Sequence, residues 1–179
     1  MNDLSNVKWT KEDQKNWTKA IKNYYDIEYL ISLTPVAKQK ILFTTGCSAK
    51  KSGKNQGTPS EMYWGQKNLN FYKMMDRFNL DYGVCSDHLG IVFRDEIFDN
   101  YDVHPSDIND KIKRNLGEII SKKVLARGYK TILFFNGSPL QSRPYFEMLY
   151  YSQLKNYYFT KLDIVESHFS PDQELDLFE

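Results

Sequence analysis

The stretch KQKILFTTGCS, residues 38–48, predicts a buried strand that runs into a glycine turn. An apolar run of this length, bounded by turn residues, is typical of a strand inside a sheet. Two later stretches repeat the pattern: LDYGVCS, residues 80–86, and KTILFFNGSP, residues 130–139. Helical patterns separate the three strands, and such alternation indicates a mainly parallel sheet covered by helices. We therefore expect an α/β fold, a three-layer sandwich with a mainly parallel central sheet.

The segments between and beyond these strands set the expected domain organisation. Helical spacing, capping residues and proline positions predict four helices and one last strand. The helices are expected over residues 10–34, 60–79, 104–129 and 143–159, and the last strand over residues 161–167. We expect one α/β domain over residues 1–179, in which residues 1–38 form a helical extension and residues 39–179 form the core.

The composition excludes several classes of protein. The 179 residues are 41% hydrophobic and 26% charged, which fits an ordinary globular protein. No apolar run approaches the roughly 18 residues of a membrane span, and the polar N-terminus lacks the apolar core of a secretory signal. Only two cysteines are present, which suits a reducing compartment, so we expect a cytoplasmic protein. The net charge of +1 offers no global basic field, so any binding of nucleic acid requires a local patch.

All three predicted strands end in polar turns, and ligands of such sheets bind beyond the carboxyl ends of the strands. The first turn, GCSAKKSGK, carries Lys50, Lys51 and Lys54. Lysines and exposed backbone N–H groups can hold a phosphate, although the spacing is not that of a P-loop. We expect these three lysines to contact DNA phosphates. The alternative is a solvated loop whose lysines only prevent aggregation.

The two cysteines admit three interpretations. Cys47 and Cys85 each lie at a strand end, and CSDH, residues 85–88, has Cys-x-x-His spacing with His88. A structural zinc site needs four ligands, and no further cysteine exists. Buried free thiols are therefore the favoured interpretation, and no metal site is expected. A nucleophilic pair of cysteine and histidine is the remaining alternative.

An unusual concentration of acids follows the second strand, within DYGVCSDHLGIVFRDEIFDNYDVHP, residues 81–105. Asp87 comes directly after the buried strand, and Asp102 follows Tyr101 in a loop. A carboxylate at a strand end can orient water or stabilise positive charge on a sugar, so these two are the catalytic candidates. The structural alternative is that Asp87 only caps the following loop. Asp107 fits the N-terminus of the helix at residues 104–129, whose cap is expected at Ser106 or Asp107.

The third strand ends in FNGSPLQSRPY, which introduces an amide. Asn136 can donate and accept hydrogen bonds at once, which suits the edge of a nucleobase. Ser138, in the same turn, is a candidate contact to phosphate.

Several motifs together resemble a family widespread in bacteria and phages. They are GCSAKK, PSEMYWG, VCSDHLGIV, DEIFDNYD and NGSPLQSRPY, which cover residues 41–107 well and residues 133–145 loosely. The same pattern, more weakly, resembles the YaaA peroxide-stress family and the core domain of archaeosine synthase, a group near the Brig-type glycosylases that excise modified bases from phage DNA. The matching residues are Cys47, Ser48, Lys50, Lys51, Tyr63, Ser86, Gly90, Tyr101, Asp102 and Gly137. This chain departs from the family by carrying Asp87 and His88 where alanine and lysine are frequent.

The resemblance implies a uracil-DNA-glycosylase-like fold and a nucleobase as the object handled. We expect a DNA glycosylase-like enzyme of antiviral defence that hydrolyses the N-glycosidic bond of a modified base, with DNA as partner and no cofactor. The residues expected to contact the base are Cys47, Ser48, Tyr63, His88, Tyr101 and Asn136. Two alternatives stay open: a base transferase in nucleic-acid modification, and a DNA-binding stress protein without turnover.

Overall fold

The computed structural model describes residues 11, 12, 15, 40–104, 107–137 and 142–168. Most of the helix expected over residues 10–34 lies outside the described residues. Ser138, expected to contact phosphate, also lies outside them. The first half of the core contains β1 (Ile41–Gly46), β2 (Gln56–Gly57), α4 (Pro59–Met62), α5 (Gln66–Arg77), β3 (Tyr82–Ser86), β4 (Gly90–Phe93) and β5 (Phe98–Asp99). The second half contains α6 (Asp110–Ala126), β6 (Thr131–Phe135), α7 (Arg143–Tyr151), β7 (Lys155–Phe159) and α8 (Asp163–His168).

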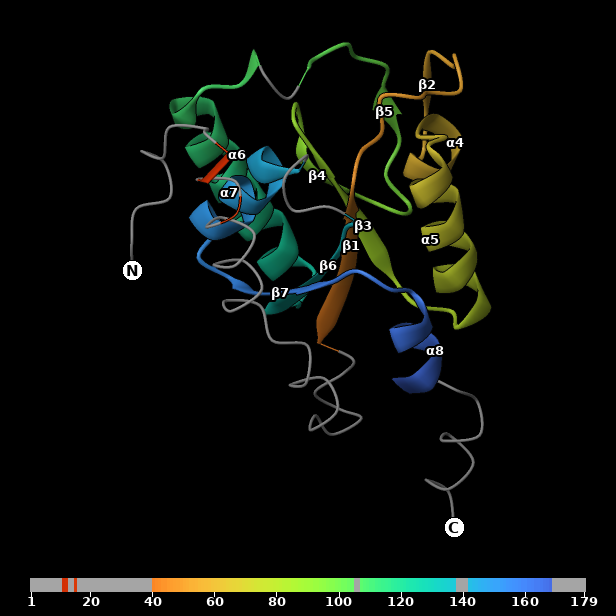
Figure 1. The fold of residues 1–179 in the computed structure, drawn as a ribbon. Helices are drawn as coiled ribbons and strands as arrows, with labels where there is room; N and C mark the ends of the chain where they lie inside the picture. Colours follow the sequence, from red (N-terminus) through yellow and green to blue (C-terminus); the bar gives the residue numbers. More distant parts are fainter. Residues whose placement is uncertain (1–10, 13–14, 16–39, 105–106, 138–141, 169–179) are drawn as a thin grey trace.

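The sheet is the centre of an α/β fold, as predicted (Figure 1). Its five strands lie in the order β4-β3-β1-β6-β7, and a separate two-stranded ribbon joins β2 to β5. β3, β1, β6 and β7 run parallel, and only β4 runs antiparallel to its neighbour β3. The three strands predicted from the sequence are therefore confirmed and form the middle of the sheet. Because they are parallel, their polar carboxyl ends lie at one edge.

Helices cover both faces of the sheet, with α6 and α7 on one side and α5 on the other (Figure 1). Alternate residues of β1 divide between the two cores: Leu42 packs with α6 and α7, whereas Phe43 packs with α5. Phe134 and Leu133 of β6 divide in the same way. Both faces of each central strand are thus buried, which explains why these strands read as continuous apolar runs.

Two predicted helices need correction, and one strand was not predicted. The helix expected over residues 60–79 is two helices, α4 and α5, because the chain turns at Tyr63–Gly65 between them. The segment GIVF forms β4, which was not predicted. The helix expected from residue 104 begins only at Asp110, where the Asn109 side chain caps it by accepting from Ile112 N–H at 3.0 Å. Asp107 therefore lies before the helix, and the expected caps at residues 106 and 107 are wrong.

The last part of the chain also differs from the prediction. The helix expected over residues 143–159 ends at Tyr151, and Lys155–Phe159 forms the edge strand β7. Gln153, which has a φ of 57°, turns the chain between the two. The strand expected over residues 161–167 is wrong, because this segment forms α8. Val165 of α8 packs into the core on the side of α5.

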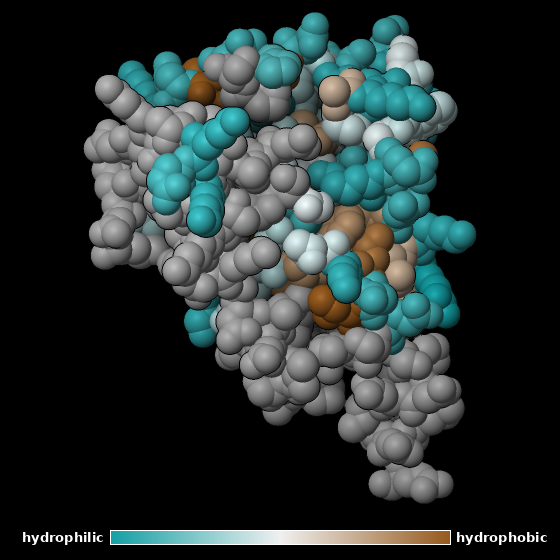
Figure 2. Space-filling model, in the orientation of Figure 1, coloured by the Kyte–Doolittle hydropathy of each residue, from teal (hydrophilic) through white to brown (hydrophobic). Residues whose placement is uncertain are grey.

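Where Figure 2 colours the surface, it is mainly hydrophilic, and hydrophobic residues appear near the centre of the view. Among the described residues, no helix has both the length and the apolar character that crossing a membrane requires.

Candidate functional site

The carboxyl ends of β1 and β3 lie side by side and create the candidate site. Gly46 pairs with Cys85 in the sheet, and the next residue, Cys47, continues the ladder by donating its N–H to Cys85 O at 2.8 Å. The chain then leaves both strands, so Cys47 and Asp87 face each other across the edge. Cys47 Sγ donates to Asp87 Oδ1 at 3.7 Å. The two strand ends that the sequence singled out therefore meet.

Asp87 is almost completely buried, with 3% of its surface exposed. Tyr145, from the first turn of α7, donates its hydroxyl to Asp87 Oδ2 at 3.4 Å and lies 3.0 Å from Cys47 Sγ. Burial raises the pKa of the Asp87 carboxyl above its ordinary value, because desolvation outweighs the hydrogen bonds that favour the anion. The structure thus holds a buried carboxyl group, with donors aimed at both of its oxygens, at the edge where ligands of α/β sheets bind.

A chain of hydroxyl groups lies next to Asp87. Ser86 Oγ accepts from the backbone N–H of His88 at 3.1 Å and of Leu89 at 2.9 Å. Both acceptor positions of this oxygen are then used, so its own hydrogen is donated to the Tyr101 hydroxyl, 2.6 Å away. The Tyr101 hydrogen remains for the Tyr63 hydroxyl, its second partner. Ser86 therefore fixes the turn that carries Asp87 and orients Tyr101.

Tyr101 is half-buried, and charged or aromatic side chains flank its ring. Lys51 places Nζ 4.1 Å from the ring centroid and donates to the Tyr101 carbonyl oxygen. The exposed His88 lies against the same ring, with centroids 4.8 Å apart. His88 thus contacts Tyr101 and carries aromatic surface at the rim of the site.

The tyrosine at position 63 does not have the place expected for it. Tyr63 is fully buried, and its ring stacks on Phe98 with centroids 5.3 Å apart. A nucleobase cannot stack on that ring in this structure. Tyr63 instead contacts the site through its hydroxyl group, which lies against the hydroxyl group of Tyr101.

The three lysines expected to contact phosphate have different surroundings in the structure. Lys51 is held on Tyr101, as described above. Lys54 forms a surface ion pair with Glu61 at 2.9 Å, on the side of α4. Lys50 is exposed, so of the three it is the one most free to meet a phosphate. Ser48 accepts from Gly65 N–H at 3.1 Å and donates to Lys50 O at 2.7 Å, which fixes the loop against the start of α5.

Asp102 does not join Asp87. It is exposed in the loop after Tyr101, and no contact to Asp87, Cys47 or Tyr145 is present within the described part of the chain. Asn136 is buried at the end of β6, one residue beyond the pair Thr45–Phe135 of the sheet. Its amide donates to Ser142 Oγ at 2.6 Å, which ties β6 to the start of α7.

Neither cysteine has the lowered pKa of a nucleophilic thiol. Both are free, and burial raises the pKa of Cys47 to about 11 and that of Cys85 to about 12. Cys85 points into the core with α6 and α7, while His88 lies on Tyr101, so the two do not converge. Across residues 40–104, 107–137 and 142–168, no three His, Cys, Asp or Glu side chains are grouped as a metal site.

Sequence reasoning missed two residues of the site, Tyr145 and Lys67. Lys67 occupies the second position of α5 and is half-buried. A Cβ atom built on Gly46 would lie 3.6 Å from Lys67 Nζ and 3.6 Å from carbons of the Tyr145 ring. Both side chains therefore lie over the end of β1, next to Cys47. Tyr145 directly follows the third polar turn, which was the available signal for it; nothing in the sequence around Lys67 indicated its position.

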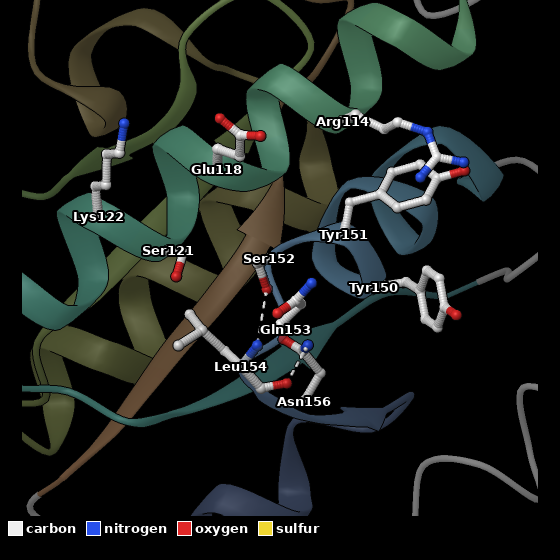
Figure 3. A pocket seen from close by; sticks show the side chains of 10 residues that line it. All are labelled: Arg114, Glu118, Ser121, Lys122, Tyr150, Tyr151, Ser152, Gln153, Leu154 and Asn156. Carbon is white, nitrogen blue, oxygen red and sulfur yellow. Dashed lines mark hydrogen bonds between the residues drawn. The ribbon is translucent and has the colours of Figure 1, made fainter. Parts of the chain in front are cut away.

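A groove of about 690 Å³ opens elsewhere, between α6 and the turn from α7 to β7 (Figure 3). Its wall includes Arg114, whose guanidinium lies 4.3 Å from the centroid of the Tyr151 ring. None of the strand-end residues described above lines it. The buried carboxyl group at the sheet edge, rather than this groove, carries the chemistry that the sequence indicated.

The arrangement can transfer a proton and stabilise positive charge. Asp87 supplies the acid, Tyr145 and Cys47 hold it, and the rim carries the cation of Lys51 and the imidazole of His88. Comparisons with protein-family models, with curated proteins and with solved structures find no match to this chain.

Proposed function

We propose that this protein is a DNA glycosylase-like hydrolase that removes a modified nucleobase. The observation that carries the proposal is Asp87, a buried carboxyl group with a raised pKa at the carboxyl ends of β1 and β3. The motif resemblance to glycosylases of modified phage DNA supports the same assignment, as does the position of the site at the edge of the sheet.

Hydrolysis of an N-glycosidic bond needs a proton for the departing base and a negative charge near the sugar. A carboxyl group with a raised pKa keeps its proton closer to neutral pH and can deliver it to the base. The carboxylate formed by this transfer then lies where positive charge develops on the sugar carbon, and it directs the attacking water. We assign both steps to Asp87: burial favours the protonated form that the first step needs, and the donors Tyr145 and Cys47 stabilise the carboxylate that this step leaves.

The DNA is expected to approach over Lys50, His88 and Tyr101. A base turned out of the stack would meet the aromatic surface of His88 and Tyr101, which are exposed and half-buried, respectively. Lys50 is the candidate phosphate contact, because Lys51 and Lys54 already have partners.

The test measures released bases by mass spectrometry after incubation with genomic DNAs that carry different modified bases. We expect one class of modified DNA to lose its base and acquire abasic sites. Asp87→Asn keeps the shape of the side chain and should reduce release at least about 100-fold. Asp99→Asn, an exposed acid in the same segment, is the matched control and should be neutral.

Two results would change the assignment. If Asp102→Asn abolishes release while Asp87→Asn does not, the catalytic carboxylate is Asp102. Tight binding of DNA with no released base and no abasic site would contradict the glycosylase proposal.

A further inference from the structure

Lys67 is a half-buried amine that the proposed hydrolysis does not use. Its Nζ lies over Gly46, beside the Tyr145 ring and one residue from Cys47. Within the described part of the chain, no hydrogen bond or ion pair joins this amine to another side chain. Partial burial of a lysine is costly when, as here among the described residues, no carboxylate pairs with it, and this points to a role for the amine itself.

Three features favour the neutral form of this amine. Burial lowers the pKa of Lys67 below its ordinary value. The residue lies in the first turn of α5, a helix of 12 residues, where the helix dipole opposes a positive charge. No acidic residue lies in that first turn to compensate. A neutral lysine beside a reaction site is a nucleophile toward carbonyl groups.

We propose that Lys67 attacks the aldehyde of an abasic sugar, so that the protein also cleaves the DNA strand at the site from which a base was removed. The inference deepens the proposed function, because removal of a base leaves such a sugar next to Asp87. The ring-opened form of an abasic sugar presents an aldehyde at C1′, which is the group that a neutral amine captures.

The reaction balances without an oxidant or a cofactor. The neutral Lys67 Nζ adds to C1′, and a proton from solvent lets the C1′ hydroxyl leave as water, which gives a protonated imine. A base, a role that we assign to the ionised Asp87 carboxylate, removes a proton from C2′. The electrons of that C–H bond form a C2′=C3′ double bond, and the bond from C3′ to the phosphate oxygen breaks. Water then hydrolyses the imine, which restores the lysine and leaves an unsaturated aldehyde on the DNA end.

Reductive trapping on DNA with a preformed abasic site tests this step directly. Borohydride converts the imine to a stable amine, so the expected product is a covalent complex of protein and DNA that maps to Lys67 by mass spectrometry. Lys67→Arg keeps a cation and Lys67→Met keeps the aliphatic chain, yet neither can form the imine. Both should lower trapping and strand cleavage at least about 100-fold. Lys73→Met, exposed on the same helix, is the control and should change neither.

The inference is overturned if the wild-type protein forms no adduct, if the adduct maps to another amine, or if Lys67→Arg traps as well as the wild type. Abasic DNA bypasses removal of the base, so the two proposals can fail separately. Base release without trapping supports the glycosylase proposal and contradicts the lyase inference. Trapping at Lys67 without release from any modified DNA supports the lyase and contradicts the glycosylase.

Discussion

Asp87 and Cys47, forty residues apart in the chain, are joined by a hydrogen bond of 3.7 Å at the carboxyl edge of the sheet. The parallel pairing of β1 with β3 produces this contact, since it brings the ends of both strands to one level. The carboxyl group is consequently placed by the backbone ladder rather than by a flexible loop.

The ionisation of Asp87 should make the stability of the protein depend on pH. The folded state raises the pKa of this carboxyl group, so it binds the proton more tightly than the unfolded chain does. Stability should therefore fall as pH rises from the unfolded pKa, about 4, through the folded pKa. Cys47 and Tyr145, which face the carboxyl group, stay protonated throughout this window because their pKa values are also raised.

Asp87→Asn cannot ionise and should remove this dependence. Relative to the wild type, we expect the variant to gain stability as pH rises from 4 to 8, because only the wild type loses the bound proton over that range. Urea unfolding across that range measures the difference, with Asp99→Asn as the exposed control. Parallel pH profiles for wild type and Asp87→Asn would contradict burial as the cause of the raised pKa.

Cys47 should react slowly with alkylating reagents in the native protein. With a pKa of about 11, only about one thiol in 1,000 is ionised at pH 8, and the thiolate is the reactive form. Alkylation by iodoacetamide should accelerate with pH up to that value and should be much faster after denaturation. Cys47→Ser should retain base release. Rapid labelling at pH 7 together with an inactive Cys47→Ser variant would instead support the alternative that Cys47 is a nucleophile.

Removal of the Ser86 hydroxyl should be more damaging than removal of the Tyr101 hydroxyl. Ser86→Ala leaves the N–H groups of His88 and Leu89 without their acceptor, and each such loss costs about 1–3 kcal/mol when buried. Tyr101→Phe removes the acceptor of the Ser86 hydrogen and the donor to Tyr63, but leaves these two N–H groups satisfied. Chemical denaturation of both variants tests the order, and equal destabilisation would show that Ser86 does not fix the turn.

Among the lysines of the first turn, Lys50→Ala should have the largest effect on DNA binding. It should weaken binding similarly across sequences and lower the salt slope by about one. Lys54→Ala breaks an exposed ion pair, with lysine and glutamate side chains 51% and 45% exposed, and should change affinity little. Titrations of DNA at several salt concentrations compare the two, and an unchanged slope in Lys50→Ala excludes it as a phosphate contact.

The contact between α6 and α7 should not tolerate a side chain at position 117. A Cβ atom on Gly117 would lie 2.7 Å from Tyr151 Cβ and 2.8 Å from Met148 O, so the helices would have to separate. Although alanine favours a helix by about 1 kcal/mol over glycine, overpacking of this kind costs about 1–3 kcal/mol. Gly117→Ala should therefore lower the free energy of unfolding, while Asn115→Ala, exposed on the same helix, should not.

The sequence predicts the middle of the sheet because its strands are buried on both faces, which leaves long apolar runs such as ILF and TILFF. It does not predict β4, whose four residues GIVF follow a polar turn within an acidic segment. The predictions for the last two segments are wrong because YYF, residues 157–159, fits either period, and KLDI, residues 161–164, alternates polar and apolar residues like a strand. In these short segments, tertiary contacts decide between the two structures.

The candidate site is predictable where it follows a strand and unpredictable where a helix supplies the residue. Asp87 and Cys47 come directly after β3 and β1, so their convergence follows from a parallel sheet. Tyr145 reaches Cys47 from 98 residues away, and Lys67 depends on where the turn between α4 and α5 sets the start of its helix. The local sequence pattern around a residue does not show which residues from distant parts of the chain it will contact.

Cys47 packs against both hydrophobic cores, the one under α6 and α7 and the one under α5. The site therefore connects the two hydrophobic cores, which otherwise lie on opposite faces of the sheet. Neither layer can open alone without disturbing it, so local unfolding that spares one half of the protein still disassembles the site. Activity and the cooperative melting of the whole domain should accordingly disappear in one transition, and amide exchange at Cys47 should be as slow as in the centre of β1.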